Sequence, residues 1–480
     1  MALQLNQELQ NKYPHLEISV LKYSDAMKDN DSKRIDSEFF KRDILAIEHN
    51  ISKIGYKYFS EFIEILTDYT ANGSFASLNA NVILYDNENF AKWIRIKDLE
   101  ANNFENCRYV DEKGYLFLKK SSLFGGELLI SKTGEYLGKA FIVPKINTRM
   151  TLADNIFLIK LKDISNEFMY VYINSKIGQN FISKLSQGAA QPTIIKDSLR
   201  KIKIPLFSIE FQQQIEQMVR RSHECLKQSK DLYREAEVLL YQELGLNPQN
   251  PLATIAPVSQ SLNFSVRTLK ESLHTTGRLD SEYYQIKYDE IEKVIKNYRG
   301  GYFQISQSEI KDKNFNPQTD KQYRYIELAN IGANGNISEP IIDFGENLPS
   351  RAKRLVKTGD MIMSSVEGSL QSCALITDEF DDCIVSTGFY VLNSVNLNSE
   401  TFLVLFKSAF FQEYLHKFPS GTILTAISKD ELRNIIIPKI NLQIQTQIAE
   451  KIKQSFTLRK KANELLQIAK QSVENAIEKG

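Results

Sequence analysis

The sequence predicts a mixed α/β (α+β) fold: two tandem, similar globular domains and two long antiparallel helices that pair as a coiled coil. Three observations predict this fold. They are an internal repeat, short β-type runs in the first part of each repeat, and a long helical pattern in the second part. The chain has 480 residues, of which 42% are hydrophobic and 25% charged. These values are ordinary for a globular protein with two or three domains.

The repeat shows itself in segments that recur in the same order. KRIDSEFF (33–40) resembles GRLDSEYY (277–284), and residues 188–215 match residues 421–448 at a distance of 233 positions. Such a long period excludes solenoid arrays, whose units run to roughly 20–50 residues. Two similar domains in tandem remain.

The first part of each repeat predicts strands, because short runs rich in β-branched and aromatic residues alternate with turn signals. These runs are NVILY, KWIRI, YLFL, ELLIS, KAFIV and NIFLIKL in the first repeat, and YRYIEL, GDMIM, CALIT and GFYVL in the second. Helical patterns over 167–185 and 401–418 follow them. Each repeat therefore begins with an α/β globular domain.

The second part of each repeat predicts a long helix. Residues 209–245 contain no proline and no interior glycine, and apolar or small residues recur at alternating spacings of four and three, which is a heptad pattern. The seam positions are Ile215, Val219, Ser222, Leu226, Ser229, Tyr233, Ala236 and Leu240, and in the second repeat Ile448, Ile452, Ser455, Arg459, Ala462, Leu466, Ala469 and Val473. About 35 helical residues span about 50 Å. Small residues at every seventh position allow close approach, so we expect the helices to pair. The alternative is that each helix packs on its own globular domain.

Glycine and proline predict the boundary between the repeats. Gly245 ends the first helix, and LNPQNPLATIAPVSQS, with three prolines, is a linker. The predicted order is a globular domain over 1–208, a helix over 209–246, a linker over 247–261, a globular domain over 262–438 and a helix over 439–480.

Composition narrows the class of protein. Net charge is only +1, so any nucleic-acid surface requires positive charge gathered on one face. No apolar run reaches the ~18–20 residues that cross a bilayer, and the N-terminus lacks the apolar core of a secretory signal. The four cysteines show no CxxC spacing and the five histidines are scattered. We therefore expect a cytoplasmic protein with reduced thiols, no membrane association and no metal site.

The whole pattern resembles the specificity (S) subunit of type I restriction–modification systems. Residues 188–215 and 421–448 each show a Gly-led loop, a Lys-Asp-x-Leu turn, an Ile-x-Ile-Pro strand and a Gln-rich helix start. The RIDSEFF/RLDSEYY and GELLIS/GDMIM pairs look like further features of the family, and the resemblance covers nearly the whole chain. It implies that each globular domain is a target-recognition domain for one half of a split DNA sequence. The helices would set the spacing and dock methyltransferase subunits.

The resemblance also implies which partners the chain binds and which subunits carry out the catalysis. The partners would be double-stranded DNA and two DNA adenine methyltransferase subunits that bind S-adenosylmethionine, with restriction or translocase subunits joining them. The chain itself has no P-loop and no Asn/Asp-Pro-Pro-aromatic motif, so we expect no catalytic residue and no cofactor in it. Three alternatives stay open: an S-like subunit of a related methylation/cleavage system, a self-sufficient nuclease using acids such as Asp360 and Glu367, and a scaffold that binds no DNA.

Candidate DNA contacts are basic and small polar side chains in loops, because Lys and Arg position phosphates and polar groups meet base edges. The alternative for each loop is a plain turn or a solvated surface. The candidates are Lys119, Lys120, Lys132, Thr133, Tyr136, Lys139, Gln191 and Thr193 in the first repeat, and Arg351, Lys353, Arg354, Ser364, Ser365, Thr422 and Thr425 in the second.

Candidate methyltransferase contacts are residues that occur in both repeats, since a partner that binds twice needs the same surface twice. They are Arg200, Gln212 and Gln214, and Arg433, Gln445 and Gln447. The alternative is that these side chains cap and brace their own domain.

Overall fold

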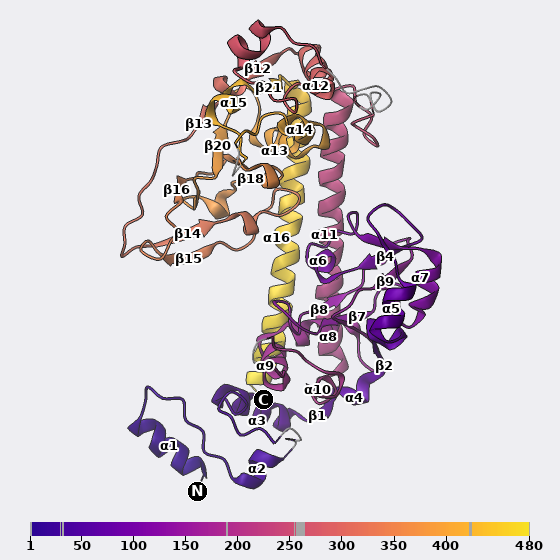
Figure 1. The fold of residues 1–480 in the computed structure, drawn as a ribbon. Coiled ribbons are helices and arrows are strands. Elements are labelled where there is room, and N and C mark those ends of the chain that lie inside the picture. Colours follow the sequence, from indigo (N-terminus) through magenta and orange to yellow (C-terminus); the bar gives the residue numbers. More distant parts are fainter. Residues whose placement is uncertain are drawn as a thin grey trace. The chain divides into compact units, whose positions relative to one another are not determined.

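The structure of the chain is a computed structural model. It describes residues 2–28, 30, 33–188, 191–253, 255, 265–421 and 425–479. The chain forms two compact units, one made of Met1–Glu224 with Lys461–Gly480 and the other of Cys225–Lys460. Each unit contains one globular part and a portion of both long helices, α11 (Ile209–Glu243) and α16 (Leu442–Glu478) (Figure 1). The predicted mixed fold with two long packed helices is confirmed.

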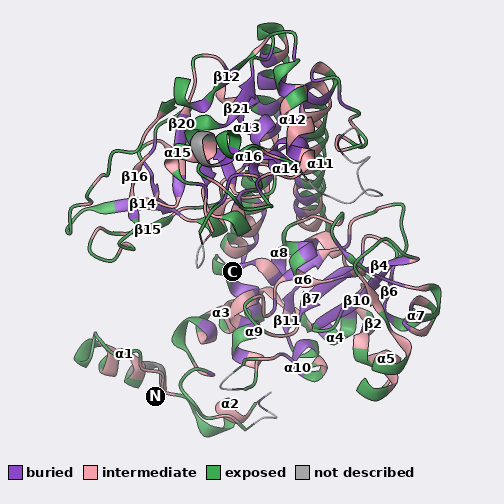
Figure 2. Ribbon diagram, turned by 45° about the horizontal axis from the view of Figure 1, so that its top comes forward, coloured by how far each residue is buried: buried purple, intermediate pink, exposed green. Residues whose placement is uncertain are grey.

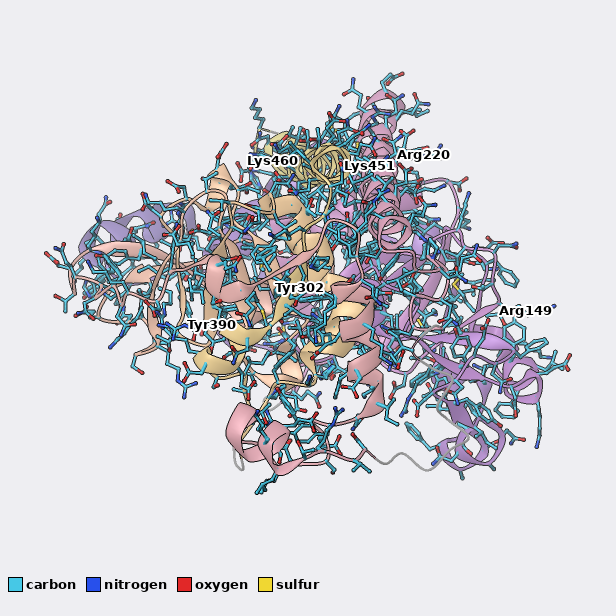
Figure 3. All side chains as sticks on the ribbon, turned by 90° about the horizontal axis from the view of Figure 1, so that it is seen from above. Arg149, Arg220, Tyr302, Tyr390, Lys451 and Lys460 are labelled. Atoms are coloured by element: carbon cyan, nitrogen blue, oxygen red, sulfur yellow. The ribbon has the colours of Figure 1, made fainter. Side chains whose placement is uncertain are left out.

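The two helices pair in an antiparallel direction. In the second unit the hydroxyls of Ser229 and Ser455 lie 2.9 Å apart, and further along α11 Glu235 forms an ion pair with Lys451, which lies earlier on α16 (Figure 3). In the first unit Ser222 Oγ donates to the carbonyl oxygen of Ala462 at 2.8 Å. The small residues of the predicted seam are fully buried, namely Ser222, Ser229, Ala236, Ser455, Ala462 and Ala469.

The helices also pack on the globular part of their own unit. In the first unit Ile215 and Val219 share a core with Ala469, Val473 and residues of the sheet. Both packing arrangements considered from the sequence therefore occur together.

The described residues of the first unit form three sheets. They are β1 (Tyr56–Tyr58) with β11 (Lys203–Pro205); β2 (Ile63–Asp68), β10 (Ile156–Leu161), β7 (Leu128–Ser131) and β8 (Ala140–Ile142); and β3 (Leu84–Tyr85), β5 (Arg108–Val110), β4 (Ala91–Ile94), β9 (Met150–Leu152) and β6 (Ser122–Leu123), each in spatial order. The four-stranded sheet is covered on both faces. Leu128 and Ile130 face the core shared with the helices, whereas Leu129 faces the core of the five-stranded sheet. This explains why β7 is one continuous apolar run instead of an alternating one.

The second unit repeats this plan. Its sheets are β12 (Tyr302–Gln304) with β21 (Ile436–Pro438); β13 (Glu309–Ile310), β20 (Phe389–Asn393), β17 (Met361–Ser364) and β18 (Cys373–Leu375); and β15 (Ile341–Phe344), β14 (Gln322–Ile326), β19 (Ile384–Ser386) and β16 (Ala352–Leu355). Met361 and Met363 face the core that contains the long helices, and Ile362 faces the opposite core. The central strands are buried, as Figure 2 shows.

Other helices are short. They are α1 (Ala2–Lys12), α2 (Tyr23–Met27), α3 (Arg42–Ile54), α4 (Phe59–Phe62), α5 (Phe75–Asn81), α6 (Ile96–Glu100), α10 (Lys196–Arg200), α12 (Ile286–Lys296) and α15 (Lys429–Asn434), with 3₁₀ or π turns η1 (Tyr69–Asn72), η2 (Lys119–Ser121), η3 (Lys270–Thr276), η4 (Ile305–Gln307), η5 (Leu328–Asn330), η6 (Glu367–Ser369) and η7 (Asp378–Phe380). Across the described ranges, no helix has the length and apolarity that crossing a membrane requires.

The helical pattern of each globular part is broken at a serine. In the first unit α8 (Asn166–Asn174) and α9 (Lys176–Leu185) meet at Ser175, whose Oγ accepts a hydrogen bond from the amide of Gly178 at 3.2 Å. In the second, α13 (Ser399–Lys407) and α14 (Ala409–Leu415) meet at Ser408 in the same way. A serine hydroxyl satisfies a free amide at a helix start, so it favours a new helix over a continuous one.

One run predicted as a strand is mostly helical. YLFL (115–118) overlaps α7 (Glu112–Phe117), and Asp111 caps this helix by accepting a hydrogen bond from the amide of Gly114 at 2.7 Å. The local cap outweighs the weak strand preference of the aromatic and aliphatic side chains.

Candidate nucleic-acid interface

In the first unit, two of the predicted loops lie against each other. Thr133, in the turn after β7, pairs through its backbone with Thr193, in the loop before α10. The Thr193 hydroxyl donates to Thr133 Oγ1 at 3.2 Å, and the amide of Ile194 donates to the carbonyl of Lys132 at 3.0 Å. Gln191 is exposed on the same loop. Tertiary structure thus brings together candidates that are about sixty positions apart.

A buried carboxylate holds the base of these loops. Asp68, at the end of β2, accepts Lys132 Nζ and Lys196 Nζ, each at 3.1 Å. Burial alone raises the pKa of the Asp68 carboxyl, but the two ammonium groups outweigh it, and the pKa lies below its usual value. One carboxylate faces two cations, so positive charge remains in excess here. Lys132 is held beneath the loop, which favours a bracing role over direct phosphate contact.

Lys196 was missed as a candidate. It belongs to the Lys-Asp-x-Leu turn, and its counterpart Lys429 forms an ion pair with Asp312 in the second unit. The signal in the sequence was the recurrence of this turn at the same distance.

Lys119 and Lys120 are exposed next to the same corner. The amide of Lys120 donates to Asn72 Oδ1 and its Nζ donates to the carbonyl of Ala71, both at 3.0 Å. Both acceptors belong to η1, which directly follows Asp68. The two lysines therefore add positive charge beside the paired loops.

Tyr136 and Lys139 lie at the far end of the turn after β7. Lys139 Nζ is 2.6 Å from the carboxylate of Glu100, and it also lies 5.6 Å from the ring centre of Tyr136. The turn needs Gly138, because a Cβ there would come within 2.4 Å of Ile182. The charge of Lys139 is already neutralised within the unit.

The equivalent loops meet in the second unit. The amide of Ile427 donates to the carbonyl of Ser365 at 2.8 Å, and Val366 pairs with Ala426. Thr425 accepts a hydrogen bond from the amide of Glu367 through its carbonyl. Thr422, a candidate on this loop, lies outside the described residues.

Ser364 is not a surface residue. Its side chain is buried, and its hydroxyl lies 2.8 Å from that of Ser369. The prediction that it contacts DNA is therefore wrong, because the last residue of β17 lies inside the sheet. Ser365 is half-buried, and its hydroxyl donates to the carbonyl of Gly388 at 2.9 Å.

The basic group 350–354 is largely a strand, since β16 begins at Ala352. Arg351 is exposed, and its carbonyl accepts the amide of Thr387 at 2.8 Å, next to the Gly388 that contacts Ser365. Lys353 is half-buried, and its carbonyl accepts the amide of Phe315. The basic group thus approaches the paired loops of this unit.

Arg354 differs from its neighbours. It is half-buried, burial lowers its pKa, and its Nε and Nη1 have no hydrogen-bond acceptor within the part of the chain that is described. Tyr390 (Figure 3) lies close to it and donates its hydroxyl to the carbonyl of Ile427 at 2.8 Å. A cation with free donors therefore lies beneath the loop.

Two of the predicted partner-binding residues brace their own unit. Gln212 Nε2 donates to the carbonyl of Phe207 at 3.0 Å, and Gln445 Nε2 donates to the carbonyl of Ile440 at 2.9 Å. Gln445 is buried and also accepts the amide of Asn398 at 2.8 Å. The prediction of a partner contact is wrong for Gln445, because a buried amide with satisfied bonds offers nothing to a partner.

The other four repeated residues are exposed. Gln214 and Gln447 are exposed at the helix starts, and Arg200 and Arg433 each form an ion pair with the aspartate three positions before them. They provide a similar surface in both units.

Asp360, considered as a nuclease acid, is fully buried. It accepts Lys311 Nζ at 2.8 Å and the amide of Lys357 at 2.9 Å, and so shapes the turn before β17. Glu127 does the same in the first unit, accepting the amides of Phe124 and Gly125 at 2.8 Å. The environment of Asp360 is that of a structural acid, because its carboxylate accepts a backbone amide and an ammonium group of its own unit.

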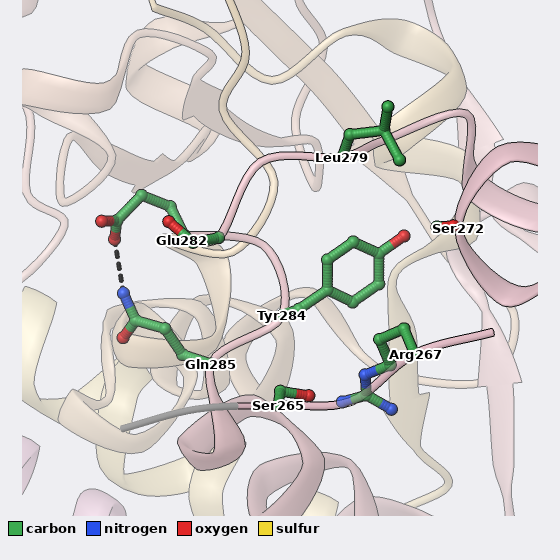
Figure 4. A pocket seen from close by; sticks show the side chains of 8 residues that line it. Ser265, Arg267, Ser272, Leu279, Glu282, Tyr284 and Gln285 are labelled. Carbon is green, nitrogen blue, oxygen red and sulfur yellow. Dashed lines mark hydrogen bonds between the residues drawn. The ribbon is translucent and has the colours of Figure 1, made fainter. Parts of the chain in front are cut away.

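In each unit a cavity adjoins the recurring Arg-x-Asp-Ser-Glu segment, which spans residues 34–38 in the first unit and 278–282 in the second. In the second unit it has a volume of about 540 Å³ and is lined by side chains that include Arg267, Leu279 and Tyr284 (Figure 4). In the first unit a cavity of about 710 Å³ is lined by residues that include Phe39 and Phe40.

Part of the chain resembles a known family of DNA specificity domains. Residues 60–235 match the family model of the type I restriction modification DNA specificity domain. This match lies in the first repeat of the chain, which is therefore similar to that domain. The chain is 21% identical over 360 residues to the type I restriction enzyme MjaVIII specificity subunit of Methanocaldococcus jannaschii, and the match covers 73% of this chain and 78% of that one.

Two S subunits are among the solved structures that resemble the chain. One is the type I S subunit from M. genitalium, with a TM-score of 0.37, 11% identity, and coverage of 86% of this chain and 96% of that one. The other is the HsdS subunit from Thermoanaerobacter tengcongensis, with a TM-score of 0.26, 14% identity, and coverage of 88% and 96%.

Proposed function

We propose that the chain is a specificity subunit of a type I restriction–modification system, and that each of its units reads one tract of a bipartite DNA sequence with its pair of contacting loops. One observation carries the proposal: the same two loops meet on the same sheet in both units but carry different side chains. Lys132 and Thr133 in the first unit correspond to Ser365 and Val366 in the second. A repeated scaffold with different loop chemistry suits the reading of two different tracts.

Within each unit the cations and the polar loop side chains have different tasks. In the first unit Lys119, Lys120 and Lys196 neutralise phosphates and position the duplex, whereas Gln191 and Thr193 contact base edges. In the second unit Arg351 and Arg354 take the first task.

The chain is a non-catalytic subunit in this proposal. Two DNA adenine methyltransferase subunits bind S-adenosylmethionine and transfer the methyl group, and restriction or translocase subunits join the complex through them. The exposed residues that occur in both units, Gln214 with Arg200 and Gln447 with Arg433, support it because two identical partners need two similar surfaces. An S-like subunit of a related combined methylation/cleavage system would use the same surfaces.

The test is co-expression with the methyltransferase partner, followed by genome-wide mapping of methylated sites. We expect two short specific tracts separated by a fixed gap. Exchange of residues 263–438 for those of a relative should change one tract, and exchange of the first globular part should change the other, so each exchange is the control of its counterpart. A continuous motif, or an exchange that altered both tracts, would refute the proposal.

The gap length is expected to follow the helices. Insertion of four residues into each long helix, about one turn or 6 Å, should lengthen the gap by one or two base pairs, since DNA rises about 3.4 Å per pair. Both tracts should stay unchanged on the same methylation maps.

A further inference from the structure

The arginine of the recurring Arg-x-Asp-Ser-Glu segment contacts the chain just before the loop that precedes the Lys-Asp-x-Leu turn. In the first unit Arg34 forms two hydrogen bonds with Asp36, Nε to Oδ2 at 2.7 Å and Nη2 to Oδ1 at 2.8 Å. Its remaining Nη1 donates to the carbonyls of Lys184 at 3.0 Å and Ser186 at 3.3 Å. These carbonyls belong to the end of α9, immediately before the loop that carries Gln191.

The second unit has the same arrangement. Arg278 donates Nε and Nη2 to the carboxylate of Asp280, at 2.8 Å and 2.6 Å. Its Nη1 and Nη2 also donate to the carbonyls of Phe418 and Pro419, both at 3.0 Å. Nη1 lies 3.7 Å from Glu431, so this arginine contacts the chain both before and after the loop.

An aromatic ring completes each cluster. Phe39 lies close to two cations, with the Arg34 guanidinium 5.1 Å and the Lys184 ammonium 4.6 Å from its centre. The ring centre of Tyr283 likewise lies 4.6 Å from the Arg278 guanidinium and 4.7 Å from the Lys417 ammonium. The cluster of the first unit is formed by Arg34, Asp36, Phe39 and Lys184, and that of the second by Arg278, Asp280, Tyr283 and Lys417.

The other end of each loop is also held. In the first unit the backbone pairing of Thr133 with Thr193 restrains it, and in the second the pairing of Val366 with Ala426 does so. Each loop is therefore attached at its start by an arginine and at its end by a β-bridge. Holding the two ends of a loop in place lowers the conformational entropy that is lost when a ligand binds.

We propose that Arg34 and Arg278 are positioning residues for DNA recognition, each holding the recognition loop of its own unit and so controlling the selectivity for one tract only. This inference rests on the function proposed above. A guanidinium is needed because the planar group serves a carboxylate and two carbonyls at once, which a lysine ammonium on its flexible stem does not do. Neither arginine touches DNA in this proposal.

The test uses the full chain in complex with its methyltransferase partner. Methylation rates are measured on duplexes with the cognate site and on duplexes with one substituted base pair in either tract. We expect Arg34→Lys to reduce discrimination about tenfold in the tract read by the first unit, which is the order of magnitude by which one mismatched pair weakens binding. Discrimination in the other tract should not change, and Arg278→Lys should give the reciprocal result.

Two further variants keep the test decisive. Glu38→Gln is the matched control, because Glu38 lies in the same segment but is exposed and pairs only with Lys41 among the contacts described; it should leave both tracts unchanged. Asp36→Asn keeps the carbonyl contacts of Arg34 and weakens its orientation. If Arg34→Lys does not fold, Asp36→Asn should still reduce discrimination in the first unit's tract.

The outcomes are distinguishable. Loss of discrimination in a single tract supports the positioning role. A bipartite wild-type target with unchanged discrimination in all foldable variants, or an equal loss in both tracts, overturns it while leaving the proposed function intact. A wild-type target that is not bipartite overturns the proposed function itself.

Discussion

The buried hydroxyl pair between the long helices predicts a measurable coupling. Ser455 Oγ donates to the carbonyl of Ser229 at 2.7 Å, the two hydroxyls lie 2.9 Å apart, and both side chains are fully buried. Ser455→Ala removes both contacts and leaves the Ser229 hydroxyl buried without a partner. It should lower the free energy of opening by about 1–3 kcal/mol.

The other two variants should cost less. Ser229→Ala removes one bond but leaves Ser455 donating to the carbonyl, so it should cost about 0.5–1.5 kcal/mol. The double variant leaves no orphan hydroxyl and should cost about as much as Ser229→Ala alone. The two single costs therefore exceed the double cost by about 1 kcal/mol or more, which is the coupling energy.

Native-state hydrogen exchange of the full chain is the suitable assay, because a chain with two units does not unfold in one two-state step. Protection of amides near positions 229 and 455 reports the local free energy of opening. Ser472→Ala is the control, since its hydroxyl bonds only the carbonyl of Ile468 on an exposed face, and it should stay within about 0.5 kcal/mol. Additive single effects, or a Ser455→Ala cost no larger than that of Ser229→Ala, would refute the reasoning.

Three further predictions concern the units themselves. Gln445→Ala should destabilise the chain by about 1–3 kcal/mol through its lost buried bonds, whereas Gln447→Ala should leave thermal stability unchanged and reduce co-purification with the methyltransferase. The pKa of the Asp68 carboxyl is lowered in the folded state, so the stability that this group provides is complete above its usual pKa of 3.8 and is lost as the pH falls through the lower folded value. Asp68→Asn should be less stable than the wild type at neutral pH, and it should lose less stability on acid titration. The double variant Lys119→Gln/Lys120→Gln should reduce the slope of log binding constant against log salt concentration by about two, and an unchanged slope would exclude these lysines from phosphate contact.

The sequence alone determined the repeat, the class of fold and the pairing face of the helices. Local periodicity suffices for this, since small residues at every seventh position have one low-energy use, the close contact of two helices. It also indicated the two loops of each repeat, because glycine and small polar residues after an apolar strand predict a turn. The type and spacing of residues along the chain were enough for these inferences.

Only the tertiary structure decided which polar side chains remain available at the surface. Lys132 looked free in its loop, but its partner Asp68 is 64 positions away, and the carbonyl that Arg34 contacts at Lys184 is 150 positions away. Ser364 and Gln445 are buried by segments that no local pattern identifies. A charged or polar group is expensive to bury unless it is paired, so its role depends on the distant atoms that pair with it, and folding alone brings those atoms together.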